Sequence, residues 1–185
     1  MNFLASREQL RASLMRWALV CVPACLLIGI LPGRIWTADS AWFAALVKPA
    51  IYPPPAAFGI VWGTLFVMMG LALALVGSAW GARGRAVAIA AFAVQFALNL
   101  AWTPVFFGAH LMTGGLVLLA GIVVAVALTA VLFWRVRRMA GALLVPYLAW
   151  VMFAAVLNYE FLRLNPQADG AAGGVGASAR VRIGA

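Results

Sequence analysis

Five long stretches without a charged side chain occupy most of this 185-residue sequence. A helix that crosses the hydrocarbon core of a bilayer needs roughly 20 mainly apolar residues. The stretches cover residues 17–32, 56–80, 86–108, 111–134 and 139–161, the last with Glu160 near its end. Hydrophobic residues form 66% of the sequence and charged residues 9%, a balance that a water-soluble domain does not keep. The sequence therefore predicts an all-α membrane protein, a bundle of five transmembrane helices.

The first stretch is the shortest and contains Pro23. We expect its helix either to extend back past Arg16, with that side chain snorkelling to the interface, or to tilt little. No small-x-small cleavage site stands out after it, so we expect a membrane span rather than a cleaved signal peptide.

The net charge of +9 comes from basic clusters at the ends of the stretches. The clusters are Arg7, Arg11 and Arg16; Arg83 and Arg85; and Arg135, Arg137 and Arg138. With five spans all three lie on one side, so the positive-inside rule predicts a cytoplasmic N-terminus. Because no cluster extends along an exposed face, we expect no nucleic-acid partner. Helical spans favour the bacterial cytoplasmic membrane, since outer membranes mostly hold barrels, with the outer membrane as the alternative.

We divide the chain into three parts. Residues 1–16 form a cytoplasmic N-terminal segment, residues 17–165 the five-helix transmembrane domain, and the Gly- and Ala-rich residues 166–185 a disordered tail. The longest connection, residues 33–55, ends in three consecutive prolines, which favour extended polyproline geometry. We expect it to form a semi-rigid lid across the mouth of the bundle, with a short interfacial helix within residues 36–47.

Polar and aromatic side chains share one face of the third span. Gln95, Asn99, Trp102 and Phe106 are spaced by four, three and four residues. An amide side chain inside a membrane needs a partner or a cavity, so two interpretations stay open: hydrogen bonds between helices, or a pocket. The opposite face predicts close helix contact, within the bundle or in a homodimer, because it carries Ala86, Ala90, Ala93, Ala97 and Ala101.

Two more aromatic stripes lie on the second and fifth spans. Trp62, Phe66 and Met69 form the first, and Pro146, Trp150, Ala154 and Asn158 the second. Such a stripe is more often packing than a ligand site. However, Trp62 and Trp150 fall well inside their spans, where an indole N–H needs an acceptor. With the amides of the third span they predict an aromatic-walled cavity for a flat apolar ligand.

The sequence does not carry the residues that several classes of function require. Glu160 is the one acid within a span, and we expect it to pair with Arg163 at i+3, which argues against proton-coupled transport. We find no Gly-rich phosphate loop and no nucleophile with a base. Cys21 and Cys25 lie on one helix face without His or acidic neighbours, so we expect buried small side chains and no metal site.

The motifs in chain order resemble the TspO/MBR family, the tryptophan-rich sensory proteins and translocator proteins. The resemblance runs over residues 17–165 and is most specific in the block Asn-Leu-Ala-Trp-Thr-Pro-Val-Phe-Phe-Gly at 99–108. It also covers Trp-Phe-Ala-Ala-Leu-Val-Lys-Pro at 42–49, the prolines at 53–55, Val-Pro-Tyr-Leu-Ala-Trp at 145–150, and 157–165. The resemblance implies a five-helix bundle, commonly a homodimer, with a cavity that binds porphyrins and, in eukaryotic relatives, cholesterol and benzodiazepine-type drugs.

The resemblance also implies roles for residues. Trp62 and Trp150 match paired tryptophans implicated in light-dependent porphyrin breakdown, and are the candidate catalytic residues. The predicted ligand-binding set is Phe43, Pro53, Trp62, Phe66, Gln95, Asn99, Trp102, Phe106, Tyr147, Trp150 and Ala154. A short sterol-recognition pattern matches Leu157, Tyr159 and Arg163, on the helix face away from Trp150, where we expect lipid contact.

Two departures from the family pattern affect the lid. Ile51 stands where a tryptophan is usual, and Phe43 replaces a common tyrosine. We expect a membrane protein that binds a tetrapyrrole, protoporphyrin IX or heme, as ligand and requires no cofactor. Its role is porphyrin sensing, handling or light-dependent degradation. The alternatives are a carrier of porphyrins or sterol-like lipids, and a regulatory sensor without turnover.

Overall fold

The computed structural model describes residues 6–171, and these form helices and connecting loops without a strand. The helices are α1 (Arg7–Ile35), α2 (Ala41–Ala45), α3 (Pro55–Gly77), α4 (Arg85–Thr103), α5 (Met112–Val136), α6 (Arg138–Leu143) and α7 (Val145–Leu164). A π-helical turn, Pro104–Gly108, continues α4, and a 3₁₀ turn, Pro166–Ala168, follows α7.

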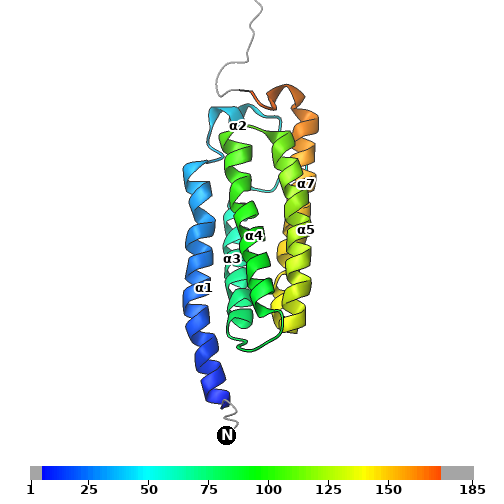
Figure 1. The fold of residues 1–185 in the computed structure, drawn as a ribbon. Coiled ribbons are helices and arrows are strands. Elements are labelled where there is room, and N and C mark those ends of the chain that lie inside the picture. The colour runs from blue at the N-terminus through cyan, green and yellow to red at the C-terminus, as the bar shows by residue number, and fades with distance from the viewer. Residues whose placement is uncertain (1–5, 172–185) are drawn as a thin grey trace, which may run out of the picture.

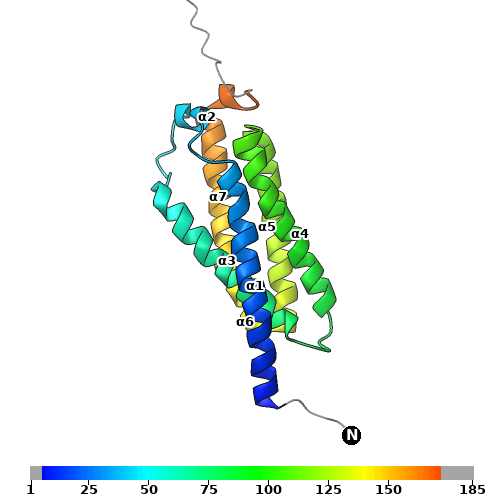
Figure 2. The ribbon, with the colours of Figure 1, turned by 90° about the vertical axis from the view of Figure 1, so that its left-hand side faces the viewer.

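Within residues 6–171, five helical segments are long and apolar enough to cross a membrane, so the predicted fold class is confirmed. They run alternately up and down one bundle (Figure 1). The extensive contacts are those of α1 with α3, α4 with α5, and α5 with α7. Figure 2 shows α3 leaning away from α7 toward the lid end.

The first helix begins before residue 17, the predicted start of the transmembrane domain. Ser6 and Gln9 form a capping box, and the helix runs unbroken from Arg7, so residues 7–16 belong to α1 rather than to a separate segment. The helix therefore continues back past Arg16, as one of the two alternatives predicted. Pro23 does not break the helix.

Prolines reshape the third and fifth spans. Pro146 lacks an amide hydrogen and its ring crowds the carbonyl four residues earlier. The segment accordingly breaks at Leu144, between α6 and α7. Pro104 acts similarly at the end of α4, where the backbone widens to the π turn and Ala109 N donates to Pro104 O at 2.8 Å.

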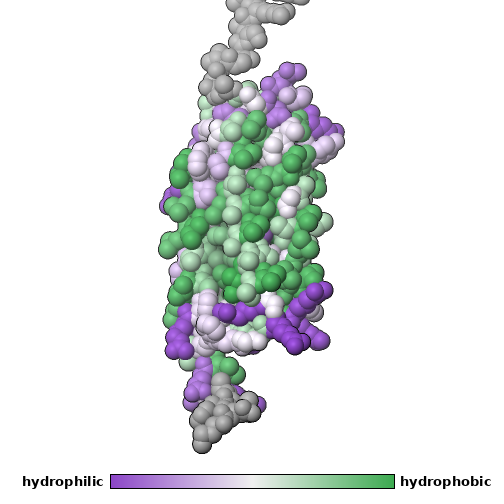
Figure 3. All heavy atoms as spheres, in the orientation of Figure 1, coloured by the Kyte–Doolittle hydropathy of each residue, from purple (hydrophilic) through white to green (hydrophobic). Residues whose placement is uncertain are grey.

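The outside of the bundle is apolar in its middle and polar at both ends, as Figure 3 shows. The three arginine clusters lie at the end where α1 begins, because α3–α4 and α5–α6 turn there (Figure 1). The small-residue face of α4 points outward, since Ala86, Ala90, Ala93 and Ala97 are exposed.

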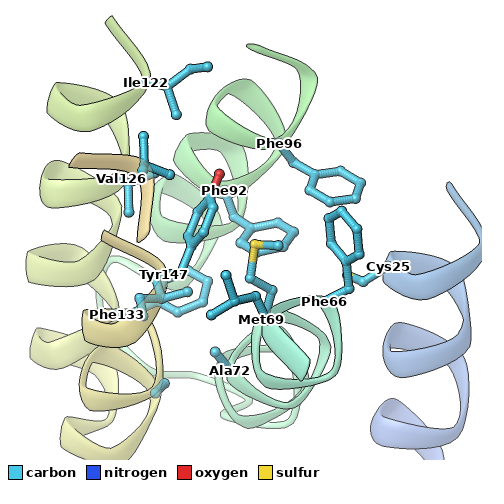
Figure 4. Close-up of a cluster of buried hydrophobic side chains, with 14 of the residues drawn as sticks. Cys25, Phe66, Met69, Ala72, Phe92, Phe96, Ile122, Val126, Phe133 and Tyr147 are labelled. Atoms are coloured by element: carbon cyan, nitrogen blue, oxygen red, sulfur yellow. The ribbon is translucent and has the colours of Figure 1, made fainter. Parts of the chain in front are cut away.

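The core of the bundle lies between α3, α4, α5 and α7. In Figure 4 Met69 of α3 faces Phe92 of α4 and Tyr147 of α7, with Phe133 of α5 beside them. All four side chains are buried. Met69, predicted on the stripe with Trp62 and Phe66, is thus a core residue.

The predicted disordered tail from residue 166 is wrong for its first residues. Trp42 Nε1 donates to Ala168 O at 3.1 Å, and Gly170 N donates to His110 O at 2.9 Å. The Asp169 carboxylate accepts from Met112 N at 2.6 Å and so caps α5. These contacts tie residues 166–171 to the lid end of the bundle. Residues 172–185 of the predicted tail lie outside the described residues.

Candidate ligand-binding cavity

A cavity of about 470 Å³ lies beneath the lid. Residues of α1, α3, α4, α7 and the lid line it, with Leu119 from α5. Eight of the predicted ligand-binding residues are among them: Phe43, Trp62, Phe66, Asn99, Trp102, Phe106, Trp150 and Ala154. Ligand sites of small molecules span roughly 300–1,000 Å³, so the cavity has the size of such a site.

Aromatic rings from separate helices form the walls. On α3, Trp62 stacks on Phe66 with centroids 5.4 Å apart and planes 27° apart. On α4 and its π turn, Trp102 stacks on Phe106 at 5.0 Å and 21°. Trp150 of α7 meets Phe58 edge-on at 5.9 Å. The three indoles, all half-buried, therefore converge on one space rather than on lipid.

The π turn brings the last aromatic of the α4 stripe into the cavity wall. Phe106 falls within Pro104–Gly108, and it is 2% exposed. Its ring also meets Phe107 at 4.9 Å and Trp42 of the lid at 5.6 Å. The irregular turn thus joins the helix to the lid, which is a common use of π-helical insertions at functional sites.

The two amides of α4 have different surroundings. Asn99 lines the cavity. Gln95 is fully buried one turn earlier and accepts a 3.1 Å hydrogen bond from the Tyr147 hydroxyl. Gln95 and Tyr147 therefore link α4 to α7 and do not line the cavity, where they were predicted. Of the two interpretations of the stripe, a hydrogen bond between helices applies to Gln95, and a place in the pocket applies to Asn99.

Three buried polar atoms have no hydrogen-bond partner within residues 6–171: Gln95 Nε2, Trp102 Nε1 and Asn158 Oδ1. Asn158 is 2% exposed and lines the cavity wall beside Trp102. Its amide nitrogen donates to the carbonyl of Met112 at 3.0 Å, at the start of α5. That bond fixes which end of the Asn158 amide is oxygen.

The lid packs over the cavity through Phe43, which is buried against Phe106 and Phe107. Lys48 Nζ lies 4.1 Å from the centroid of the Phe43 ring and donates to the carbonyls of Phe43 and Leu46. Burial lowers the pKa of the Lys48 ammonium and raises the pKa of the Tyr52 hydroxyl. Pro53, predicted as a ligand contact, does not line the cavity.

The sterol-recognition pattern does not form one surface. Leu157 is 6% exposed and lines the cavity, contrary to its predicted position facing lipid. Tyr159 is 52% exposed on the outside. Arg163 pairs with Glu160 at 2.7 Å, which confirms the predicted ion pair. Leu157 is buried and Tyr159 is exposed, so the two side chains lie on different sides of α7.

The end of α1 contributes residues that sequence reasoning missed. Gly29, Arg34 and Trp36 line the cavity. A Cβ on Gly108 would lie 2.7 Å from the Trp36 indole, so glycine allows Trp36 to pack across the π turn. Arg34 has no acidic side chain within 4.0 Å, because Arg163–Glu160 is the sole ion pair of the described part of the chain. A position at the end of a span does not by itself indicate a place in the cavity lining.

The fold and the cavity define a helical membrane protein with a lidded, aromatic-walled cavity. The TspO/MBR family matches residues 21–164, and the chain belongs to this family. It is 41% identical over 149 residues to the tryptophan-rich protein TspO of Chlorobaculum tepidum, covering 80% of this chain and 94% of that protein. It is 41% identical over 144 residues to protein CrtK of Rhodobacter capsulatus (77% and 89% covered). It is 42% identical over 126 residues to the human translocator protein (67% and 75% covered).

Proposed function

We propose that the protein binds a tetrapyrrole, protoporphyrin IX or heme, in the cavity beneath the lid. The observation that carries this proposal is the convergence of Trp62, Trp102 and Trp150 from three helices on one space with Asn99. Indole and phenyl faces stack on a flat conjugated ring, and the Asn99 amide supplies a polar contact. No resident cofactor is needed for binding.

The rim favours a ligand that carries carboxylates. Arg34 lines the cavity at the end of α1 and has no acidic partner among residues 6–171. A guanidinium at this position pairs with the acidic edge of a porphyrin, and it has no counterpart on a sterol. Arg34 therefore supports the tetrapyrrole over a sterol-like ligand.

If the bound porphyrin is broken down by light, the excited ring and dioxygen supply the reactivity. The chain supplies orientation, shielding and redox-active side chains. We assign the last role to Trp62 and Trp150, because both line the cavity, one from α3 and one from α7. Porphyrin sensing without turnover needs the same cavity and leaves the ligand unchanged.

The test is a titration of the purified protein with protoporphyrin IX, followed by fluorescence quenching in the dark and then by absorbance under illumination. Saturable quenching at about one ligand per chain is expected. Linear, unsaturable quenching that matches empty detergent micelles would refute the binding proposal. A spectral change under light separates degradation from sensing.

A carrier of porphyrins or sterol-like lipids is the second candidate. A second hollow between α3 and α7 includes Ile60, Met68, Pro146 and Trp150, and Trp150 also lines the main cavity. The two spaces thus share a wall, which would suit a ligand arriving from the bilayer. Dark flux of porphyrin into proteoliposomes would favour the carrier, and its absence would favour degradation or sensing.

We further propose that the protein is a homodimer that contacts its second copy through α4. Its outward alanines allow close approach of another helix. The arginine clusters at the end where α1 begins support a cytoplasmic location of that end, in a bacterial cytoplasmic membrane. Substituted-cysteine labelling from each side of the membrane tests the orientation.

A further inference from the structure

Two residues of the cavity lining carry one unpaired donor and one unpaired acceptor. The donor is the indole N–H of Trp102, and the acceptor is the amide oxygen of Asn158. Both atoms are buried, and both residues line the cavity. An unmade hydrogen bond in such a place is costly to each group, so an unpaired donor and acceptor in the cavity lining indicate a polar partner.

Gly115 of α5 lies against this pair. A Cβ at Gly115 would be 3.3 Å from Trp102 Nε1 and 3.5 Å from Asn158 Nδ2. Glycine at this position keeps the space beside the Trp102 indole nitrogen and the Asn158 amide nitrogen free of a side chain. Asn158 cannot turn its oxygen away, because its nitrogen is held by the carbonyl of Met112 at 3.0 Å.

We propose that Trp102 and Asn158 form a subsite for one uncharged group of the ligand that both accepts and donates a hydrogen bond, such as a hydroxyl or a lactam. The oxygen of that group accepts from Trp102 Nε1–H, and its own hydrogen is donated to Asn158 Oδ1. A carboxylate satisfies the indole alone and has no hydrogen for Asn158. The inference rests on the proposed function and adds to it the chemical class of one ligand substituent.

The subsite also orients the ligand. Arg34 lies at the end of α1, whereas Met112 and Gly115, which border the subsite, belong to α5. These two helices lie on opposite sides of the bundle (Figure 1). A porphyrin with its acidic edge at Arg34 therefore turns its opposite edge toward Trp102 and Asn158.

Two porphyrins make the test specific. Haematoporphyrin carries hydroxyethyl groups on the edge opposite its carboxylates, and mesoporphyrin carries ethyl groups at the same positions. The measurement is the ratio of their dissociation constants, by fluorescence quenching in the dark. We expect the preference for haematoporphyrin over mesoporphyrin to be about tenfold greater in the wild-type protein than in Trp102→Phe. Asn158→Leu should lose the preference likewise.

Trp80→Phe is the matched control, because Trp80 is 67% exposed and lies outside the cavity lining. It should keep the wild-type ratio. Trp102→Phe retains a ring for packing, so it keeps the test informative if Asn158→Leu does not fold. Equal ratios in the wild type and Trp102→Phe, as expected if a water molecule alone serves the pair, would overturn the subsite. Failure of both porphyrins to bind saturably would instead overturn the proposed function.

Discussion

Val47 of the lid and Asn165 after α7 are joined by two reciprocal hydrogen bonds. Val47 N donates to Asn165 Oδ1 at 2.8 Å, and Asn165 Nδ2 donates to Val47 O at 3.0 Å. The same nitrogen donates to Phe161 O at 2.9 Å, which holds the amide against the end of α7. The lid is thereby fastened to the last span across 118 residues of sequence.

Replacing this amide should loosen the lid. Each bond is worth about 0.5–1.5 kcal/mol, so Asn165→Ala is expected to raise the dissociation rate of protoporphyrin IX roughly fivefold to tenfold. Asn165→Asp keeps the acceptor for Val47 N and loses the donor, and an intermediate rate is expected. Stopped-flow fluorescence measures the rates. Identical rates in all three proteins would show that the lid does not limit release.

The light reaction should depend on the paired tryptophans. Trp62→Phe with Trp150→Phe keeps aromatic walls, and dark binding should stay within about threefold of the wild type. Light-driven loss of porphyrin absorbance should stop, because phenyl rings are far poorer electron donors than indoles. Absorbance during steady illumination checks this. Undiminished bleaching in the double variant would exclude the catalytic role.

Arg34 should select for the acidic edge of the ligand. Arg34→Gln is expected to weaken the binding of protoporphyrin IX about fivefold, through loss of a charge-assisted contact. The binding of its uncharged dimethyl ester should not change. Arg163→Gln is the matched control, since Arg163 lies at the same end of the bundle and pairs with Glu160. Parallel titrations with both porphyrins decide the matter. Equal losses for the acid and the ester would contradict the pairing.

The buried bond from Tyr147 to Gln95 should contribute to stability rather than to binding. Tyr147→Phe leaves the Gln95 amide without a partner, and a loss of about 1–3 kcal/mol in unfolding free energy is expected. Gln95→Leu should cost a similar amount. The double variant should lose less than the sum of the two, because no unpaired group remains. Denaturant unfolding in detergent provides the three values, and strict additivity would argue against the coupling.

Gly70 should be required for the contact between α1 and α3. A Cβ at Gly70 would lie 2.6 Å from Val22 Cα and 2.9 Å from Cys21 O, both backbone atoms of α1. Gly70→Ala must therefore separate the helices, and a loss of about 1–3 kcal/mol is expected. Gly121→Ala is the control, since nothing lies within 4 Å of its Cβ. Thermal unfolding should distinguish the two variants, and a shared melting temperature would refute the close approach.

Hydropathy along the chain was sufficient to predict the spans, because the length of an apolar run is a local property. Stripes of side chains likewise placed Trp62, Asn99 and Trp150 in one cavity, since helical periodicity fixes which residues share a face. The boundary at residue 166 was missed because the tail's composition is typical of disorder. Residues 166–171 are held by contacts such as those of Asp169, whose carboxylate accepts hydrogen bonds from the backbone amides of Met112 and Thr113 at the start of α5.

Arg34 and Leu157 could not have been assigned from spacing. Arg34 is a charge at the end of a span, and its place on the cavity rim depends on how α1 leans on α3. Leu157 belongs to the sterol-recognition pattern, which does not indicate which of its residues faces the inside of the bundle. Both positions depend on how each helix is rotated within the bundle, and the spacing of residues along one helix does not determine that rotation.

The sequence by itself determined five membrane-spanning helices, a proline-rich lid and the faces on which indoles and amides lie, because each follows from neighbours within a few turns. Tertiary structure alone decided that Gln95 bonds to Tyr147 whereas Asn99 faces the cavity, and that Trp102 and Asn158 meet beside Gly115. The physical reason is that these outcomes depend on the relative rotation and separation of helices. Packing between distant segments sets both, including the backbone contact at Gly70 and the π turn at Pro104.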